Sequence, residues 1–149
     1  SENKVHLQDS LMNLAEKAAN KSILIYDSWL KIYEDKNKFD NEEIISRDFF
    51  IGLEKFTYNQ KNRFLQNRMK EIKEAKYETQ RRLSVSYTNL GIVYRFKQEY
   101  ESAALSYKKA MDLWDKNLTA ENNLNVLLGM PLRERNLIQK LFPSSKDKE

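Results

Sequence analysis

Turn-forming residues are almost missing from this chain, which holds only three glycines and two prolines in 149 residues. Average usage is about 7% glycine and about 5% proline, so both are strongly depleted here. An all-β sandwich or barrel needs a turn signal every 8–12 residues or so, and the chain cannot supply them. Glycine-rich phosphate-binding loops are excluded for the same reason. The sequence therefore predicts an all-α protein, and its length corresponds to about one domain.

Few residues in this chain are suited to carry chemistry. It has no cysteine, which excludes disulfide scaffolds, thiol nucleophiles and cysteine-based metal sites. Its one histidine, His6, lies near the N-terminus, where a solvated or capping role is the common one. The short motifs of zinc proteases, α/β-hydrolases, P-loops and EF-hands do not occur. We therefore expect a protein that is not an enzyme, with no catalytic residue, no cofactor and no metal site.

The sequence leaves the cellular compartment open. No apolar run approaches the roughly 18 residues that a membrane span needs. A chain without cysteine suits the cytoplasm and the periplasm equally. It begins at Ser1 without an initiator methionine, so membrane association through a missing N-terminal segment is a further alternative.

Helical spacing of apolar residues predicts three helices in the first third of the chain. The first covers about 5–20. The second covers 22–34, begins with Ser22 as its N-cap, and is apolar over most of its circumference, so we expect it to be well buried. A turn over 35–38 precedes a third helix from about 40 to 56. The apolar face of the first helix comprises Leu7, Leu11, Leu14, Ala15 and Ala18.

Charge is unevenly distributed along the chain, whose net charge is +4. Residues 34–54 carry seven acids against three bases, whereas residues 55–82 carry nine bases against three acids. Within the basic segment, 59–82 is predicted to be one long amphipathic helix whose C-terminal half is the more exposed. An acidic hairpin beside a basic helix explains this asymmetry, and a nucleic-acid surface is the alternative.

The most informative stretch combines a glycine with small residues at helical spacing. Gly91 lies within an apolar face and costs a helix about 1 kcal/mol relative to alanine, which indicates that another helix crosses too closely for a side chain. Ala103 and Ala110, on the following helix, offer matching small sites. With a short turn at 97–99, these residues predict a tight helical hairpin in which small residues face small residues.

This stretch resembles the tetratricopeptide repeat, a helix–turn–helix unit of 34 residues. The clear repeat covers 84–117, and only its late proline is replaced, by Asp115. A weaker, degenerate echo covers 23–56. The packing positions of the clear repeat are occupied by Tyr87, Leu90, Gly91, Tyr94, Tyr100, Ala103, Tyr107 and Ala110.

The resemblance implies a particular architecture. Hairpins of the repeat type would stack with the long amphipathic helix, and capping helices over 119–142 would cover the end of the stack. The first capping helix stops at Gly129, and the second begins at Pro131. We expect a single domain over 1–143, followed by a disordered tail over 144–149.

The resemblance also implies a function. Repeats of this type bind another protein, as a peptide segment or a helix, in a groove lined by the first helix of each hairpin. We therefore expect a non-catalytic scaffold that binds and stabilises a partner, as part of a longer bacterial protein, with homo- or hetero-oligomers as natural assemblies. The alternatives are nucleic-acid binding through 55–82 and a sensor or regulatory domain of a larger protein. The groove positions are Val85, Thr88, Asn89, Ile92 and Arg95, with Asp27 and Lys31 from the upstream echo.

Overall fold

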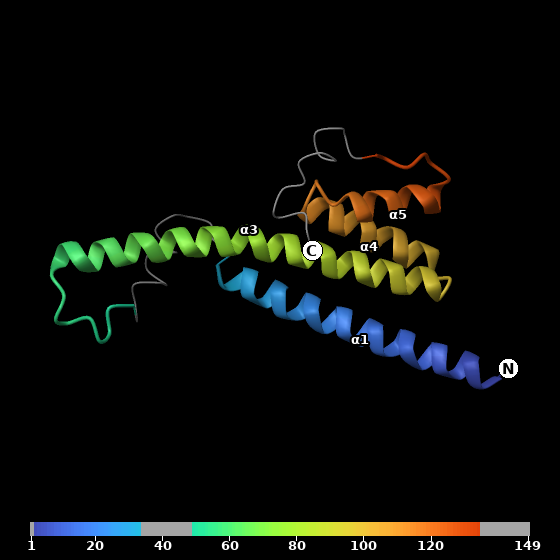
Figure 1. Cartoon of the computed structure of the whole chain (residues 1–149), viewed down its shortest axis with the longest axis horizontal. Helices are drawn as coiled ribbons and strands as arrows, with labels where there is room; N and C mark the ends of the chain where they lie inside the picture. The colour runs from blue at the N-terminus through green and yellow to red at the C-terminus, as the bar shows by residue number, and fades with distance from the viewer. Residues whose placement is uncertain (1, 34–48, 135–149) are drawn as a thin grey trace.

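The computed structural model describes residues 2–33 and 49–134, and within these ranges it contains helices and turns but no strand. Its helices are α1 (Glu2–Ile32), α3 (Tyr58–Phe96), α4 (Tyr100–Leu113) and α5 (Leu118–Leu128). Figure 1 shows α3 as the long central helix, with α1 along one side and α4 and α5 on the other. The predicted all-α class is confirmed.

The first two predicted helices are one helix, α1, of 31 residues. The predicted break at Ser22 is wrong because no glycine or proline interrupts this part of the chain. Ser22 does not cap a helix start. Its hydroxyl lies 2.6 Å from the hydroxyl of Ser86, and the two form a hydrogen bond between α1 and α3.

Helices α1 and α3 run antiparallel along their contact. The C-terminal end of α3 meets the middle of α1, where Lys97 pairs with Glu16. Farther back along α3, the ammonium group of Lys76 donates a hydrogen bond to the carbonyl of Tyr33, just after the end of α1. Among the described helices, α1 packs against α3 alone.

The long basic segment and the first helix of the predicted repeat form one continuous helix, α3, of 39 residues and about 58 Å. It begins with a capping box in which Thr57 and Gln60 satisfy each other's backbone N–H groups. The exposure expected within 59–82 is reversed. Residues 59–70 include no buried position, whereas the second half buries Ile72 and Arg81.

A tight turn joins α3 to α4, where the sequence predicts it. The turn contains Gln98, whose φ of 65° lies in the left-handed region, and the N–H of Glu99 donates to the carbonyl of Tyr94 at 2.9 Å. Hairpin packing is confirmed for Ala103, Tyr107 and Ala110, which are fully buried. Tyr100 is 56% exposed, so its expected packing role is wrong.

The close helix crossing predicted at Gly91 is confirmed, and its nearest neighbour on α4 is an aromatic side chain where the sequence predicts small residues. The neighbour is the ring of Tyr107, and a Cβ added at position 91 would lie 2.5 Å from Cε1 of that ring. Leu90, next to Gly91 on α3, is buried. Tyr87 and Tyr94 are half-buried, and they pack against a hydrophobic cluster of α4 and α5 side chains, namely Ala103, Tyr107, Ala110, Ala120 and Leu124. The hairpin is therefore built around a buried aromatic ring that lies close to the backbone of α3 at Gly91.

Helix α5 covers α4 at about the position predicted for the first capping helix. Asn117 caps its start, and Gly129 ends it with φ 66°. The predicted helix from Pro131 is wrong as far as residue 134, because this segment folds back on α5 without helical structure. There, Asn122 exchanges two side-chain to backbone hydrogen bonds with Arg133, at 3.0 and 2.8 Å.

Several predictions lie wholly or partly outside the described residues. These are the turn at 35–38, most of the helix predicted over 40–56, the end of the second capping helix and the tail at 144–149. Residues 50–56, which are described, form turns, so the predicted helix does not continue to Phe56.

Candidate interaction surface

The predicted groove residues on α3 divide into exposed and covered positions. Val85 and Asn89 are exposed on the surface of α3. Ile92 is half-buried, and it packs against the cluster of α4 and α5. Arg95 is also half-buried, and its guanidinium lies 5.7 Å from the centre of the Phe96 ring. Of these four positions, Val85 and Asn89 present the most open surface to a partner.

Thr88 was predicted to face the groove, and this is wrong. The residue is only 3% exposed. Its hydroxyl donates to the carbonyl of Ser84 at 3.0 Å and accepts from the amide of Asn117 at 2.9 Å. Thr88 lies where α3 meets the start of α5. Its hydroxyl can be buried there because it is hydrogen-bonded both to its own helix and to the N-cap residue of α5.

Asp27 and Lys31 form an ion pair with each other, at 2.7 Å along α1. Because α1 and α3 are antiparallel, with Ser22 level with Ser86, these two residues lie level with α3 positions before Val85. Arg95 is about 20 Å farther along the bundle. The seven predicted positions therefore do not form one compact site.

A row of exposed aliphatic side chains on α1 is an apolar surface that the sequence prediction missed. We call this row the α1 stripe. Its members are between 52% and 60% exposed, although three of them were predicted to form the buried face of the first helix and the other two lie in the second helix, which was predicted to be well buried. The α1 stripe consists of Leu7, Leu11, Leu14, Ile25 and Ile32.

The α1 stripe is exposed because another face of α1 makes the contact with α3. Ala19 is buried in that contact, and Ser22 reaches Ser86 from the same face. At 100° per residue, the stripe points about 100° away from this contact face. Since α1 touches only α3 among the described helices, the described part of the chain leaves the stripe uncovered.

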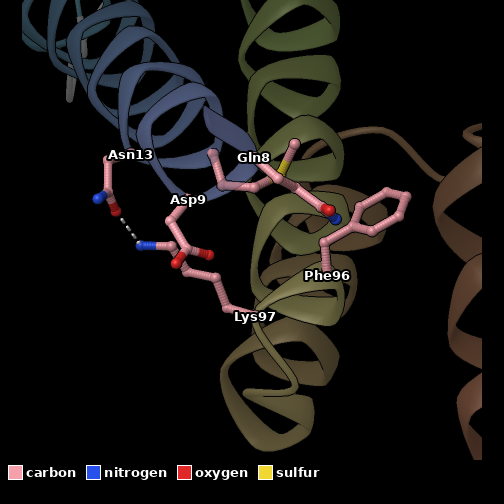
Figure 2. Close-up of a pocket in the computed structure, with 6 residues that line it drawn as sticks. Gln8, Asp9, Asn13, Phe96 and Lys97 are labelled. Atoms are coloured by element: carbon pink, nitrogen blue, oxygen red, sulfur yellow. Dashed lines mark hydrogen bonds between the residues drawn. The ribbon is translucent and has the colours of Figure 1, made fainter. Parts of the chain in front are cut away.

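A shallow depression of about 310 Å³ lies where the first half of α1 meets the end of α3. Figure 2 shows the Gln8 side chain reaching toward the ring of Phe96, and Lys97 bonded to Asn13 on the other side. The ammonium group of Lys97 donates to Asn13 Oδ1 at 2.8 Å and pairs with Glu16. Lys97, the one cationic side chain that lines the depression, is therefore already paired with α1, and these contacts join the two helices.

Ionisable groups at this junction and in the core of the α3–α4 hairpin make the fold sensitive to alkaline pH. The hydrogen bond to Glu16 raises the pKa of Lys97 above its ordinary 10.5. Burial, followed by the charge of Glu16, raises the pKa of Tyr94 above its ordinary 10.0, and burial also raises the pKa of Tyr107. A raised pKa contributes stability that is complete below the ordinary value and is lost as pH rises through the folded value. All three groups therefore destabilise the fold in the same direction above pH 10.

We accordingly expect the free energy of unfolding to fall as the pH is raised above about 10. Urea titrations followed by circular dichroism at a series of pH values from about 8 to 11 measure this change. The double variant Lys97→Met, Tyr94→Phe removes two of the three groups, and its stability should fall less steeply over the same range. An equal slope in the two proteins would contradict the assignment.

The described residues contain no group of three or more histidine, cysteine, aspartate or glutamate side chains placed to hold a metal ion. Within the same residues, no helix has the length and apolar character to cross a bilayer. His6 is exposed on α1. The surface features that remain are the α1 stripe and the exposed positions of α3.

Comparison of the sequence with protein-family models, with curated proteins and with solved structures finds no match in any of the three.

Proposed function

We propose that this chain is a non-catalytic protein-interaction module, a helical scaffold that binds a partner protein. The observation that carries the proposal is the α1 stripe. Its five side chains are each more than half exposed on a helix that packs against α3 through another face. Exposed apolar side chains gathered on one face of a helix mark an interaction site.

The free energy available at the α1 stripe is large enough for binding. Fully burying one leucine or isoleucine side chain contributes about 1.5–3 kcal/mol. Five half-exposed side chains therefore offer on the order of 5 kcal/mol before the entropic cost of association. A partner helix with its own apolar row would roughly double this amount, since it removes its own side chains from water as well.

The hairpin of α3 and α4 supports the same proposal through the resemblance to tetratricopeptide repeats. Gly91, Tyr107 and Ala110 pack the hairpin, which leaves Val85 and Asn89 exposed on α3. In this reading, Asn89 hydrogen-bonds a partner backbone while Val85 contacts an apolar side chain. This second surface lies on a different helix from the α1 stripe, so the two can be tested separately.

An affinity capture from the lysate of the source cell, read by mass spectrometry, tests the proposed function. The wild-type protein should enrich at least one protein, and the variant Leu14→Glu, Ile25→Glu should lose it. The variant Val85→Glu, Asn89→Ala tests the α3 surface in parallel. Thr88 is left unchanged because it is buried, so a charge there would damage the fold. The proposal is wrong if the wild-type protein enriches no protein, or if both variants enrich every such protein as strongly as the wild type does.

Leu105→Glu is the matched control for these variants. Leu105 is an exposed leucine on α4, so this substitution also places a glutamate at an exposed aliphatic position, on a helix that carries neither surface. It should capture as the wild type does. All variants are first compared by circular dichroism and thermal melting, because a loss of helical structure would by itself abolish capture.

Nucleic-acid binding is the second candidate, and one observation favours it. Arg63, Lys70 and Lys73 are exposed and share a face on the part of α3 that precedes its contact with α4. Phosphate binding by such a face weakens steeply as salt is raised. If the capture instead enriches RNA and ribosomal proteins that salt removes, this second function replaces the first.

A further inference from the structure

We propose that the α1 stripe is occupied by a second copy of this chain, with the two α1 helices packed antiparallel. The inference rests on the proposed function, since it names the partner of the same surface. Four properties of α1 carry it: the spacing of its exposed positions, their complementarity when one helix is reversed, the distribution of lysines, and the space beside α3.

The α1 stripe belongs to a longer row of exposed positions on α1, and this row follows the spacing of a coiled-coil seam. From Leu7 to Ile32 they recur at alternating intervals of four and three residues, which is the a and d pattern of a heptad repeat. Each of the eight positions is exposed in the structure. The full series is Leu7, Leu11, Leu14, Ala18, Lys21, Ile25, Ser28 and Ile32. The first four positions are all apolar, whereas the last four include a lysine and a serine, so the two halves of the row differ in polarity.

Reversing one helix brings complementary positions together. Pairing the two α1 helices about a point between Ala18 and Lys21 sets Leu7 opposite Ile32 of the second copy, and Leu14 opposite Ile25. At the centre, Lys21 then lies opposite Ala18, the smallest residue of the series. A lysine stem can lie along apolar surface while its ammonium group reaches water, provided that the facing residue is small. The pairing is the same from either copy, as a two-fold interface requires.

Lysine positions disfavour the parallel arrangement. With parallel helices, Lys21 would face Lys21 of the other copy in the seam, and like charges at a close contact oppose association. In the antiparallel arrangement the flanking positions also separate the charges. Lys17 then lies near Leu24 of the second copy, and Lys31 near Ser10, so no lysine faces another lysine.

The structure leaves room for this second helix. The stripe points about 100° away from the face of α1 that packs on α3. Three helices in mutual contact at equal spacing form an equilateral triangle, in which the two neighbours of any helix are only about 60° apart. A helix on the stripe therefore contacts α1 without displacing α3, and no other described helix touches α1.

The size of the interface predicts a weak dimer. The stripe is about 38 Å long on a helix about 10 Å wide, so pairing buries on the order of 800 Å² in total. This is below the 1,200–2,000 Å² or so of stable interfaces and falls in the class of weak, transient ones. We expect a monomer–dimer equilibrium with a dissociation constant on the order of 10–100 μM.

Sedimentation equilibrium of the full chain, over about 5 to 500 μM, tests the proposal. The wild-type protein should pass from monomer to dimer within this range. Leu14→Glu, Ile25→Glu should raise the dissociation constant at least about 100-fold, whereas the matched control Leu105→Glu should leave it within about twofold of the wild type. A wild-type protein that stays monomeric at the highest concentration would overturn the inference, as would an equal loss of dimer in the control.

Cysteine pairs test the orientation, because the chain has no cysteine of its own. Leu14→Cys and Ile25→Cys are prepared separately and oxidised alone and as a mixture. In the antiparallel dimer, residue 14 of one copy faces residue 25 of the other and lies about 16 Å from residue 14. The mixture should therefore crosslink, and each variant alone should not. Crosslinking of each variant alone would show a parallel pair and overturn the antiparallel assignment.

The two measurements separate this inference from the proposed function. If the wild-type protein stays monomeric but its captured partner is lost in Leu14→Glu, Ile25→Glu, the interaction surface stands and the second copy is not its occupant. If the stripe variant changes neither dimerisation nor capture, the inference and the role of the stripe in the proposed function fail together.

Discussion

Replacing Gly91 by alanine is expected to lower the free energy of unfolding by about 2 kcal/mol, although alanine is the better helix former. Without a steric conflict, this substitution in a helix would stabilise by about 1 kcal/mol. The conflict arises because the added Cβ would lie 2.5 Å from Cε1 and 2.7 Å from Cδ1 of Tyr107. That ring is fully buried, so it has no space into which to move. A leucine at the same position should prevent the hairpin from forming.

A double-mutant cycle with Tyr107 tests the cause of the effect. In the background Tyr107→Leu, which is itself destabilised, the added methyl group no longer meets an aromatic ring, and Gly91→Ala should become close to neutral. In the background Tyr107→Phe the ring remains, and the full cost should return. Urea unfolding of the six proteins gives the free energies. A stabilising effect of Gly91→Ala in the wild-type background would contradict the described contact.

The hairpin shows what sequence spacing can and cannot predict. The intervals between Gly91, Ala103 and Ala110 predict two helices in close contact, and the structure has them. They do not identify which side chain fills the space that the glycine leaves. In the structure, the ring of Tyr107 fills that space. Tyr100 matches the spacing equally well and is nevertheless exposed.

Helix α1 shows a second limit. It carries two apolar faces, one containing Ala19 and the other containing the α1 stripe, and both repeat with the period of a helix. Periodicity identifies residues that share a face, but it does not show which of two faces another helix will cover. The larger leucines were therefore assigned to the core. In the structure, the face that contains Ala19 and Ser22 is the one that packs on α3.

The polar junction of α3, α4 and α5 has no signal in the apolar pattern. Asn117 is 4% exposed and joins segments far apart in the sequence through Ser84 and Thr88. It caps the start of α5, at about the position where the sequence predicts the first capping helix to begin. Its second role depends on which helices meet there, which is a property of the tertiary structure. Thr88 was consequently assigned to an exposed groove.

Replacing Asn117 by alanine should lower the free energy of unfolding by about 3 kcal/mol. Its Oδ1 accepts from the N–H of Ala120 at 3.0 Å and caps α5. Its amide donates to the hydroxyls of Ser84 and Thr88 at 2.7 and 2.9 Å, so it also joins α5 to α3. Losing a cap costs about 1 kcal/mol, and the rest comes from two buried hydroxyl oxygens left without their donor. Thermal and urea unfolding measure the loss.

Two further substitutions separate the cap from the bridge. Asn117→Ser keeps a good capping side chain but is too short to reach α3, so it should recover only the capping share, about 1 kcal/mol, relative to alanine. Asn117→Asp also keeps the cap, yet it should be no more stable than alanine. The hydroxyl of Ser84 already donates to the carbonyl of Ala110, and that of Thr88 donates to the carbonyl of Ser84. A carboxylate would therefore face two oxygens with no proton to offer, and a buried charge without a donor is costly. If the aspartate variant matched the wild type, as cap preference alone would predict, the bridge between α5 and α3 would be refuted.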